Sequence, residues 1–348
     1  MKLRRYSLTN PTSSTDHRPP IKDLRTLMKL FVTGAAGFIG SNYVRHVLEA
    51  TDHEVTIFDA LTYAGNLESI RDVLDDSRTE FVHADICDAD AVAAAMDGHD
   101  AVVHFAAESH VDRSIADGSI FVRTNCIGTN VLCDVANQVG VGKFLHISTD
   151  EVYGSVEEGS SVETDILEPR SPYSAAKAGS DLIALSYHQT YGLPVVVTRC
   201  SNNYGPYQFP EKMIPLFTTN LIDGKQVPLY GDGMNIRDWI HVEDHNIGAQ
   251  LVLEQGEVGE VYNLGAGNEL TNVELTHRLI ELCGRDESFI RPVEDRKGHD
   301  RRYSVDISKI TELGWSLSRS FDDNLAATVE WYRENRDWWE PLKAKAGL

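Results

Sequence analysis

Short runs of β-branched and other apolar residues alternate with stretches of helical period over the first part of the chain. Each unit has the length of a strand followed by a helix that leads back to a parallel neighbour. The pattern predicts an α/β fold, a Rossmann-type doubly wound parallel sheet with helices on both faces. The expected strands span 30–33, 54–58, 80–82, 101–105, 143–148 and 194–199, and the expected helices span 38–50, 67–74, 88–96, 119–139 and 172–191.

This alternation of strands and helices ends after Ser201, where Pro and Gly residues interrupt the pattern. We expect a first domain over 28–205 and a smaller C-terminal domain over 206–348, partly interleaved with the first. Residues 1–27 are polar and lack a hydrophobic period, so they are expected to be a disordered extension or a misassigned start before Met28. Helical patterns in the second part stand near 211–223, 243–254, 271–283 and 322–334.

The charge balance narrows the choice of partners. The chain has 32 basic and 53 acidic side chains and a net charge of −21. This charge would repel nucleic acid and an anionic membrane surface, so we expect neither as a partner. The same acidity is also typical of proteins adapted to high salt, and it does not indicate a reaction.

The five cysteines are odd in number and widely spaced, without the spacing of metal ligands. We expect reduced thiols and no metal site. The sequence contains no run of about 18 apolar residues and no signal-peptide pattern. We therefore expect a soluble, cytoplasmic protein.

A glycine-rich segment, GAAGFIG, stands between the first expected strand and helix, with glycines at Gly34, Gly37 and Gly40. Glycines at such a junction allow a tight turn and let backbone N–H groups approach a pyrophosphate at the helix N-terminus. Asp59 ends the second strand about 20 residues later, where a carboxylate can accept hydrogen bonds from both ribose hydroxyls. Because that carboxylate would repel a 2′-phosphate, NAD is favoured over NADP, although Asp59 could also be a simple turn former.

Further small or polar residues stand at the carboxyl ends of the next two strands, where doubly wound folds bind ligands. Asp85 and Ile86 follow the third strand, and the pair Ala106-Ala107 follows the fourth. The alanines leave room for a cofactor, although ordinary packing explains them as well. These residues make 28–205 the expected NAD-binding domain.

Tyr173 and Lys177 lie at positions i and i+4 of the helix expected after Pro172, so they share one helix face. A neighbouring ammonium is expected to lower the pKa of the tyrosine from about 10 toward neutrality. The tyrosine could then accept a hydroxyl proton while hydride leaves the same carbon. Such pairs are also common on helix surfaces, and it is the preceding dinucleotide domain that favours catalysis.

Two adjacent acids, Asp150 and Glu151, follow the fifth strand. Once C4 of a hexose is oxidised to a ketone, the C5 proton becomes acidic, and a base there with an acid at C6 would eliminate water. Neighbouring side chains of a regular strand point to opposite faces, so we predict irregular backbone at these two acids. The alternative is a pair of solvated loop acids.

Together these motifs resemble the dTDP-glucose 4,6-dehydratases of the extended short-chain dehydrogenase/reductase superfamily, over about residues 28–335. Few families share all nine of the motifs. They are GAAGFIG (34–40), DALTYAGNLESI (59–70), HADICD (83–88), AAESHVDRS (106–114), HISTDEVYG (146–154), SPYSAAK (171–177), CSNNYGPYQFPEKMIP (200–215), IRDWIHVEDH (236–245) and DRKGHDRRY (295–303).

The resemblance implies a hydro-lyase that reduces and then reoxidises NAD within one turnover. Tyr173, assisted by Lys177 and Thr149, would take the 4-hydroxyl proton as the C4 hydride leaves. Glu151 would remove the C5 proton while Asp150 protonates the departing 6-hydroxyl. Return of the hydride to C6 would give the 4-keto-6-deoxy sugar with no net redox change.

The resemblance also implies binding residues. Arg237, Arg296 and Lys212 have independent support, because an acidic protein that binds a nucleoside diphosphate must gather cations locally. These residues lie in the expected substrate-binding domain, 206–348. The implied cofactor contacts are Gly34, Gly37, Phe38, Ile39, Gly40, Asp59, Thr62, Asp85, Ile86, Ala106, Thr124 and Asn203, and the implied substrate contacts are Ser109, Asn202, Lys212, Arg237, Asn272, Arg296 and His299.

The helical stretches 119–139 and 172–191 are apolar over more than one face. In the family that the chain resembles, the corresponding helices form a four-helix bundle between two subunits, which implies a homodimer. The same pattern would also suit core helices that face the sheet.

Several alternatives remain. A UDP-glucuronate decarboxylase or a 4-epimerase of the same superfamily would share the fold, but neither explains Asp150. A GDP-mannose dehydratase is disfavoured, because its relatives generally use NADP whereas Asp59 indicates NAD. From another class, an NAD-binding scaffold or sensor would not need Tyr173, Lys177 and both acids. The base of the nucleotide stays open, because thymine and uracil differ by one methyl group.

Overall fold

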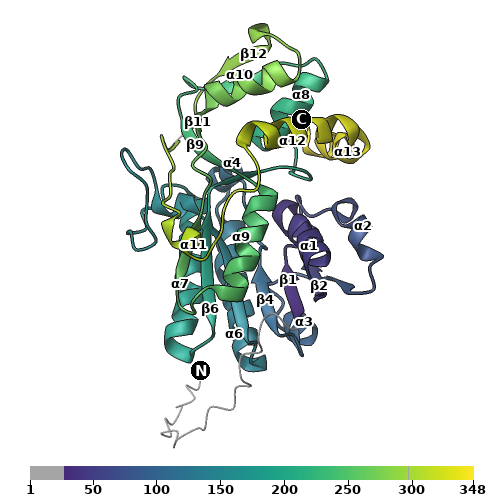
Figure 1. The fold of residues 1–348 in the computed structure, drawn as a ribbon, viewed down its shortest axis with the longest axis vertical. Helices are drawn as coiled ribbons and strands as arrows, with labels where there is room; N and C mark the ends of the chain where they lie inside the picture. The colour runs from purple at the N-terminus through teal and green to yellow at the C-terminus, as the bar shows by residue number, and fades with distance from the viewer. Residues whose placement is uncertain (1–26, 297) are drawn as a thin grey trace, which may run out of the picture.

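The central feature of the computed structural model, which describes residues 27–296 and 298–348, is a seven-stranded parallel sheet (Figure 1). Its order is β10-β6-β5-β4-β1-β2-β3, so the winding reverses between β1 and β4, which confirms the predicted doubly wound fold. The predicted extension falls outside the described residues except for Leu27. The strands are β1 (Lys29–Thr33), β2 (Glu54–Asp59), β3 (Thr79–His83), β4 (Ala101–His104), β5 (Lys143–Thr149), β6 (Val195–Cys200) and β10 (Val261–Leu264).

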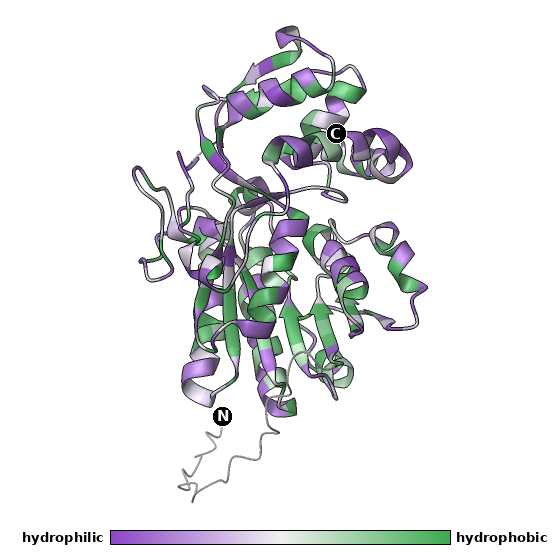
Figure 2. Cartoon of the chain, viewed as in Figure 1, coloured by the Kyte–Doolittle hydropathy of each residue, from purple (hydrophilic) through white to green (hydrophobic). Residues whose placement is uncertain are grey.

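Helices cover both faces of this sheet, and alternate residues of each strand point to opposite layers. In β1, Leu30 and Val32 join one buried cluster, whereas Phe31 joins the other. Figure 2 shows the strands coloured as hydrophobic between helices that carry hydrophilic residues. The helices are α1 (Phe38–Ala50) and α9 (Val242–Gln255), which contact each other, and α3 (Ala89–Met96), α6 (Thr129–Val139) and α7 (Pro172–Tyr191) in the layer of the second cluster.

Two predicted helices are broken in the structure. The stretch 119–139 contains α5 (Ser119–Phe121), a π-helical turn η2 (Val122–Gly128) and α6. The side-chain amide of Asn125, inside the π turn, bonds both the N–H and the C=O of Glu108 at 2.9 and 3.0 Å. Pairing with the loop after β4 therefore accompanies the irregular winding. The stretch 67–74 is likewise a 3-10 turn η1 (Leu67–Ser69) followed by α2 (Arg71–Leu74).

The second part of the chain builds a smaller layer beyond the carboxyl ends of the main strands, around its own buried cluster (Figure 1). It contains a three-stranded sheet and a two-stranded sheet. Its elements are β7 (Asn202–Tyr204), α8 (Met213–Ile222), β8 (Val227–Tyr230), β9 (Ile236–His241), β11 (Glu269–Thr271), α10 (Asn272–Leu282), η4 (Glu287–Phe289), β12 (Ile290–Val293), α12 (Phe321–Glu334) and α13 (Arg336–Ala346). The described residues also form two short helices, α4 (Val111–Ala116) and α11 (Ser308–Glu312).

Strand β10 and helix α9 come from the second part of the chain and yet belong to the first layer. Val261–Leu264 pairs in parallel with β6, and α9 packs beside α1. The sequence pattern did not indicate β10, because a strand of four residues that includes the polar Asn263 is too short to show a period. The domain bounds 28–205 and 206–348 stay a prediction, with β10 and α9 as interleaved elements.

None of the helices in the described ranges combines the length and the apolar character that crossing a bilayer requires.

Leu264 tests whether β10 is an integral part of the main sheet. Its side chain is fully buried in the first cluster, so Leu264→Ala should reduce the free energy of unfolding by about 2–5 kcal/mol. Chemical denaturation measures this loss. The control is Ile166→Ala, at a side chain that is 80% exposed, and this change should stay within about 0.5 kcal/mol. An equally small effect at Leu264 would contradict the placement of β10.

Candidate active site

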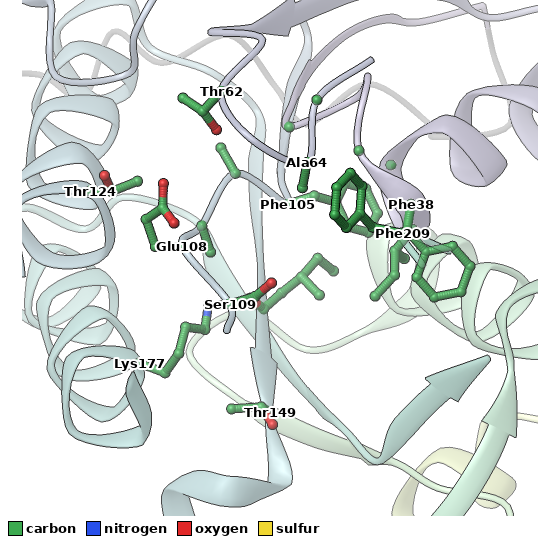
Figure 3. A pocket seen from close by; sticks show the side chains of 18 of the residues that line it. Phe38, Thr62, Ala64, Phe105, Glu108, Ser109, Thr124, Thr149, Lys177 and Phe209 are labelled. Carbon is green, nitrogen blue, oxygen red and sulfur yellow. Dashed lines mark hydrogen bonds between the residues drawn. The ribbon is translucent and has the colours of Figure 1, made fainter. Parts of the chain in front are cut away.

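Two cavities with shared lining residues lie at the carboxyl ends of the main strands, where the winding of the sheet reverses. Figure 3 shows side chains that line the first of them. The first contains every residue predicted for catalysis or for the cofactor, and Ser109, Asn202 and Lys212 of the substrate set. The second contains Arg237, Asn272, Arg296 and His299. The structure therefore brings all the predicted site residues to one cleft. The residues shared by both cavities are Glu151, Asn202, Asn203, Gln208, Glu211 and Lys212.

The glycine-rich turn after β1 has no room for side chains at two positions. Gly34 has φ +69°, and a Cβ there would lie 2.5 Å from the backbone nitrogen of Ala106. A Cβ on Gly40 would lie 2.4 Å from the carbonyl oxygen of Gly34. The turn thus packs directly against the loop after β4 and leaves its backbone open toward the cleft.

The carboxylate of Asp59 is buried and held by backbone. It accepts hydrogen bonds from Ala36 N at 2.9 Å and from Leu61 N at 2.8 Å. Burial raises the pKa of Asp59, and these two hydrogen bonds oppose the rise. Asp59 therefore holds both the glycine-rich turn at Ala36 and the loop that follows β2 at Leu61, and it also lines the cavity. The turn-forming role and the predicted cofactor role are compatible.

Strand β5 ends at Thr149, and Asp150–Tyr153 forms a 3-10 turn, η3. The Thr149 hydroxyl accepts from Glu151 N at 3.3 Å, and Gly154 ends the turn with φ +79°. The predicted irregular backbone at the two acids is confirmed. Both acids consequently line the same cavity, which a continued strand could not achieve.

The two acids have different surroundings. Burial, followed by Glu151 and Asp238, raises the pKa of Asp150 well above its usual value, and Asp150 Oδ2 has no hydrogen-bond partner within the described part of the chain. Burial also raises the pKa of Glu151, but Arg237, and then Lys212 and Arg296, oppose this rise. Asp150 is therefore suited to hold a proton, and Glu151 is suited to act as the base.

Helix α7 positions Tyr173 and Lys177. Ser171 and Ser174 form its capping box and Pro172 occupies its first turn. Lys177 Nζ donates to the carbonyl oxygen of Ile147 at 2.7 Å. Burial lowers the pKa of Lys177, and the carboxylate of Asp181 is the first of the groups that oppose this shift.

The prediction that Lys177 lowers the pKa of Tyr173 toward neutrality is wrong for the protein chain alone. Burial, followed by Glu151, raises the pKa of Tyr173 well above its usual value, and a hydrogen bond with Thr149 opposes the rise. Desolvation of the phenolate is the largest influence on this group, while the Lys177 ammonium donates to a carbonyl oxygen of β5.

The predicted substrate residues combine cations with existing partners. Lys212 Nζ bonds the carbonyl oxygen of Ser109 at 2.7 Å. Arg237 bonds the carbonyl oxygen of Asp300 at 2.9 Å and lies over the ring of Tyr303. Arg296 Nη2 lies 3.3 Å from Asp112 Oδ2, and His299 Nδ1 lies 2.7 Å from Asp295 Oδ1. Three cations thus gather beside Glu151 in a strongly acidic protein.

Comparison with known proteins agrees with this geometry. A family model described as GDP-mannose 4,6 dehydratase matches residues 31–328. A dTDP-glucose 4,6-dehydratase of Streptomyces antibioticus is 58% identical over 325 residues, which are 91% of this chain and 96% of that protein. The chain belongs to the dTDP-glucose 4,6-dehydratase family.

Among solved structures, a dehydratase resembles the chain more strongly than an epimerase does, in both fold and sequence. The dTDP-glucose 4,6-dehydratase of Streptomyces venezuelae superposes with a TM-score of 0.90 at 58% identity and covers 91% of this chain and 100% of its own. A UDP-glucose 4-epimerase of Thermotoga maritima has a TM-score of 0.82 at 33% identity, over 89% of this chain and 100% of its own. The epimerase likeness is thus weaker in sequence than in fold.

Several residues of the cleft in this dehydratase-family chain were not predicted from the sequence. The carboxyl group of Glu211 is nearly buried, and it lies 3.1 Å from Arg113 and 3.5 Å from His110. Burial raises the pKa of Glu108, which lines the first cavity beside Ser109 (Figure 3). Both stand next to predicted site residues in the quoted motifs, and that adjacency was the available signal. Also missed were Tyr63, Cys200, Gln208 and Tyr303.

No group of three or more His, Cys, Asp or Glu side chains suited to a metal ion occurs within residues 27–296 and 298–348.

Asp150→Asn tests the protonation of Asp150. Because burial raises the folded pKa above the usual 3.8, the carboxyl group favours the folded state at low pH and loses that contribution as pH rises through the folded value. The uncharged amide has no such loss. The difference in melting temperature between the variant and the natural chain should therefore change with pH, and the margin in favour of the variant should grow as pH rises above 3.8. Thermal unfolding at several pH values measures the margin, and a margin independent of pH would contradict the assignment.

Proposed function

We propose that this chain is a hydro-lyase that converts dTDP-glucose to the 4-keto-6-deoxy sugar by internal hydride transfer through tightly bound NAD. The observation that carries the proposal is the meeting of two pairs in one cleft. The acids Asp150 and Glu151 come from the turn after β5, and Tyr173 and Lys177 come from α7. The related enzyme of Streptomyces venezuelae was solved with NAD and dTDP bound, which supports both the cofactor and the nucleotide.

The cleft suits NAD on its own features. Gly34 and Gly40 leave the backbone of the turn bare at the N-terminus of α1, as a pyrophosphate requires. Asp59 lies where a carboxylate can accept from ribose hydroxyls. Asn203 lines the same cavity, and its buried side-chain oxygen has no hydrogen-bond partner among the described residues. When bound, NAD would accept a hydride from the sugar and return it.

Each protein group then has a distinct task. Tyr173, assisted by Thr149 and Lys177, would act as a phenolate that receives the proton of the 4-hydroxyl as C4 becomes a ketone. Because burial raises the pKa of Tyr173 in the chain alone, that phenolate would have to be stabilised by the positive nicotinamide ring of bound NAD. Glu151 takes the C5 proton, and Asp150 gives its own proton to the 6-hydroxyl, which leaves as water. After hydride has been added at C6, Glu151 returns a proton to C5. The different surroundings of the two acids support this division of roles.

Asp150 also separates this proposal from its rivals. A 4-epimerase or a UDP-glucuronate decarboxylase has no departing hydroxyl for it to protonate. A dehydratase of GDP-mannose, the name given to the matching family model, is disfavoured because Asp59 would repel the 2′-phosphate of NADP. A binding scaffold would have no use for two adjacent acids of raised pKa in one cleft.

The assembly that we propose is a homodimer. Both η2 and α7 carry exposed apolar side chains, and these two elements contact each other. Leu182 is 60% exposed and Ile127 is 53% exposed. A second copy of this face would cover them. We also propose a cytoplasmic location, which agrees with the five free thiols.

The substrate assignment is tested by incubating the purified protein with dTDP-glucose and following the 4-keto-6-deoxy product by its absorbance in alkali. We expect product with dTDP-glucose. Product with UDP-glucose alone would change the nucleotide and retain the mechanism. No product from either sugar would contradict the proposed reaction.

Glu151→Gln tests the order of the steps. The amide cannot remove the C5 proton, so turnover should fall by about 100-fold or more while NADH accumulates during the reaction. Near-ultraviolet absorbance follows NADH. The matched control is Glu158→Gln, at an exposed carboxylate of the following loop, which should keep normal turnover. Normal turnover in Glu151→Gln would remove this residue from the mechanism.

Leu182→Glu tests the dimer. A charge in the proposed interface should shift the particle mass from twice that of one chain to that of one chain, as measured by light scattering. The control, Ile166→Glu, puts the same charge on another exposed apolar position and should leave the mass unchanged. A single-chain mass for the natural protein would contradict the proposal.

A further inference from the structure

A fully buried ion pair lies behind Tyr173 and Lys177. Arg199 of β6 places Nε 3.0 Å from Oδ2 of Asp181, which belongs to α7. The side chains are 4% and 0% exposed. A buried ion pair is weak evidence for stability, because removing two charges from water costs about as much as their attraction returns. The proposed mechanism does not use either residue, so the pair needs another explanation.

The guanidinium of Arg199 reaches beyond Asp181. Its Nη1 donates to the hydroxyl of Tyr153 at 2.9 Å and to the carbonyl oxygen of Glu163 at 3.3 Å. The Tyr153 hydroxyl in turn donates to Asn263 of β10 at 2.8 Å. Tyr153 is the last residue of η3, the turn that contains both catalytic acids. The Arg199 side chain therefore links α7, which carries Tyr173, to η3, which carries Asp150 and Glu151.

Asp181 also stands one helical turn after Lys177, on the same face of α7. The other titratable groups that act on Lys177 are Cys200 of β6 and Cys126 of η2. His104 of β4 and His146 of β5 lie near it as well, and burial lowers the pKa of both imidazoles. His146 Nε2 lies 3.3 Å from Asp181 Oδ1. Asp181 is thus the carboxylate shared by the lysine and the arginine.

We propose that Asp181 and Arg199 are positioning residues that hold the Asp150–Glu151 turn in a fixed place relative to Tyr173 and Lys177. The two halves of the reaction come from different elements, α7 for oxidation and η3 for elimination, yet they act on adjacent carbons of one sugar. A displacement of about 1 Å between such groups can cost about 100-fold in rate. The pair, through Tyr153, prevents that displacement.

Tyr153→Phe is the sharpest test, because it deletes one oxygen and leaves the ring packing in place. Hydrogen exchange of the holoenzyme, read by mass spectrometry, should be faster in peptides covering 150–165 in this variant, and also in Asp181→Asn. The matched control is Tyr43→Phe, which removes another buried hydroxyl, bonded to Gln250 at 2.6 Å. That control should leave exchange over 150–165 unchanged. Unchanged exchange in Tyr153→Phe would overturn the proposal, even if Asp181→Asn does not fold.

Turnover gives a second measurement, which rests on the proposed function. With dTDP-glucose, Tyr153→Phe should lower kcat by about 10- to 100-fold with little change in KM, and NADH should accumulate because oxidation still precedes a misplaced elimination. Tyr43→Phe should keep kcat. A rise in KM alone, or a lower kcat without NADH, would contradict the positioning role. If the natural protein does not act on dTDP-glucose, the proposed substrate fails, and the exchange experiment still decides the role of the pair.

Discussion

The end of strand β5 at Thr149 is the constraint on which the rest of the site depends. If the strand continued, its pleat would send Asp150 and Glu151 to opposite faces of the sheet. The 3-10 turn brings both acids into the cleft, and the Thr149 hydroxyl holds the first turn of backbone. Because the strand ends at the carboxyl edge of a doubly wound sheet, the acids meet the glycine-rich turn of β1 and the Tyr173 face of α7 at the same place.

Burial raises the pKa of both acids in the turn after β5, but the groups that oppose this rise differ between them. Asp150 and Glu151 are neighbours in the chain, yet only Glu151 has cations of the second layer as its main opposing influence. By placing Arg237, Lys212 and Arg296 near Glu151, the smaller layer opposes the rise in the pKa of this acid, whereas the pKa of Asp150 stays well above its usual value.

The chain crosses between the layers more than once, and this explains why the two layers form one working unit. Helix α9 and strand β10 return to the first layer after the chain has built part of the second. Asn263 of β10 then bonds Tyr153 beside the catalytic turn. Strand β10 thus makes a hydrogen bond to a residue that lies more than a hundred positions earlier in the chain.

Local pattern was enough to determine the sheet of six predicted strands, the glycine-rich turn at Gly34–Gly40, the position of Tyr173 and Lys177 on one helix and the irregular backbone at Asp150. Each of these depends on the spacing of residues within a few positions, which period and steric fit control directly. Tertiary structure alone decided the seventh strand, the π turn around Asn125, the raised pKa of Tyr173 and the bond between Arg199 and Tyr153. These features arise from desolvation and from contacts between segments far apart in the chain, and no local pattern of residues encodes such contacts.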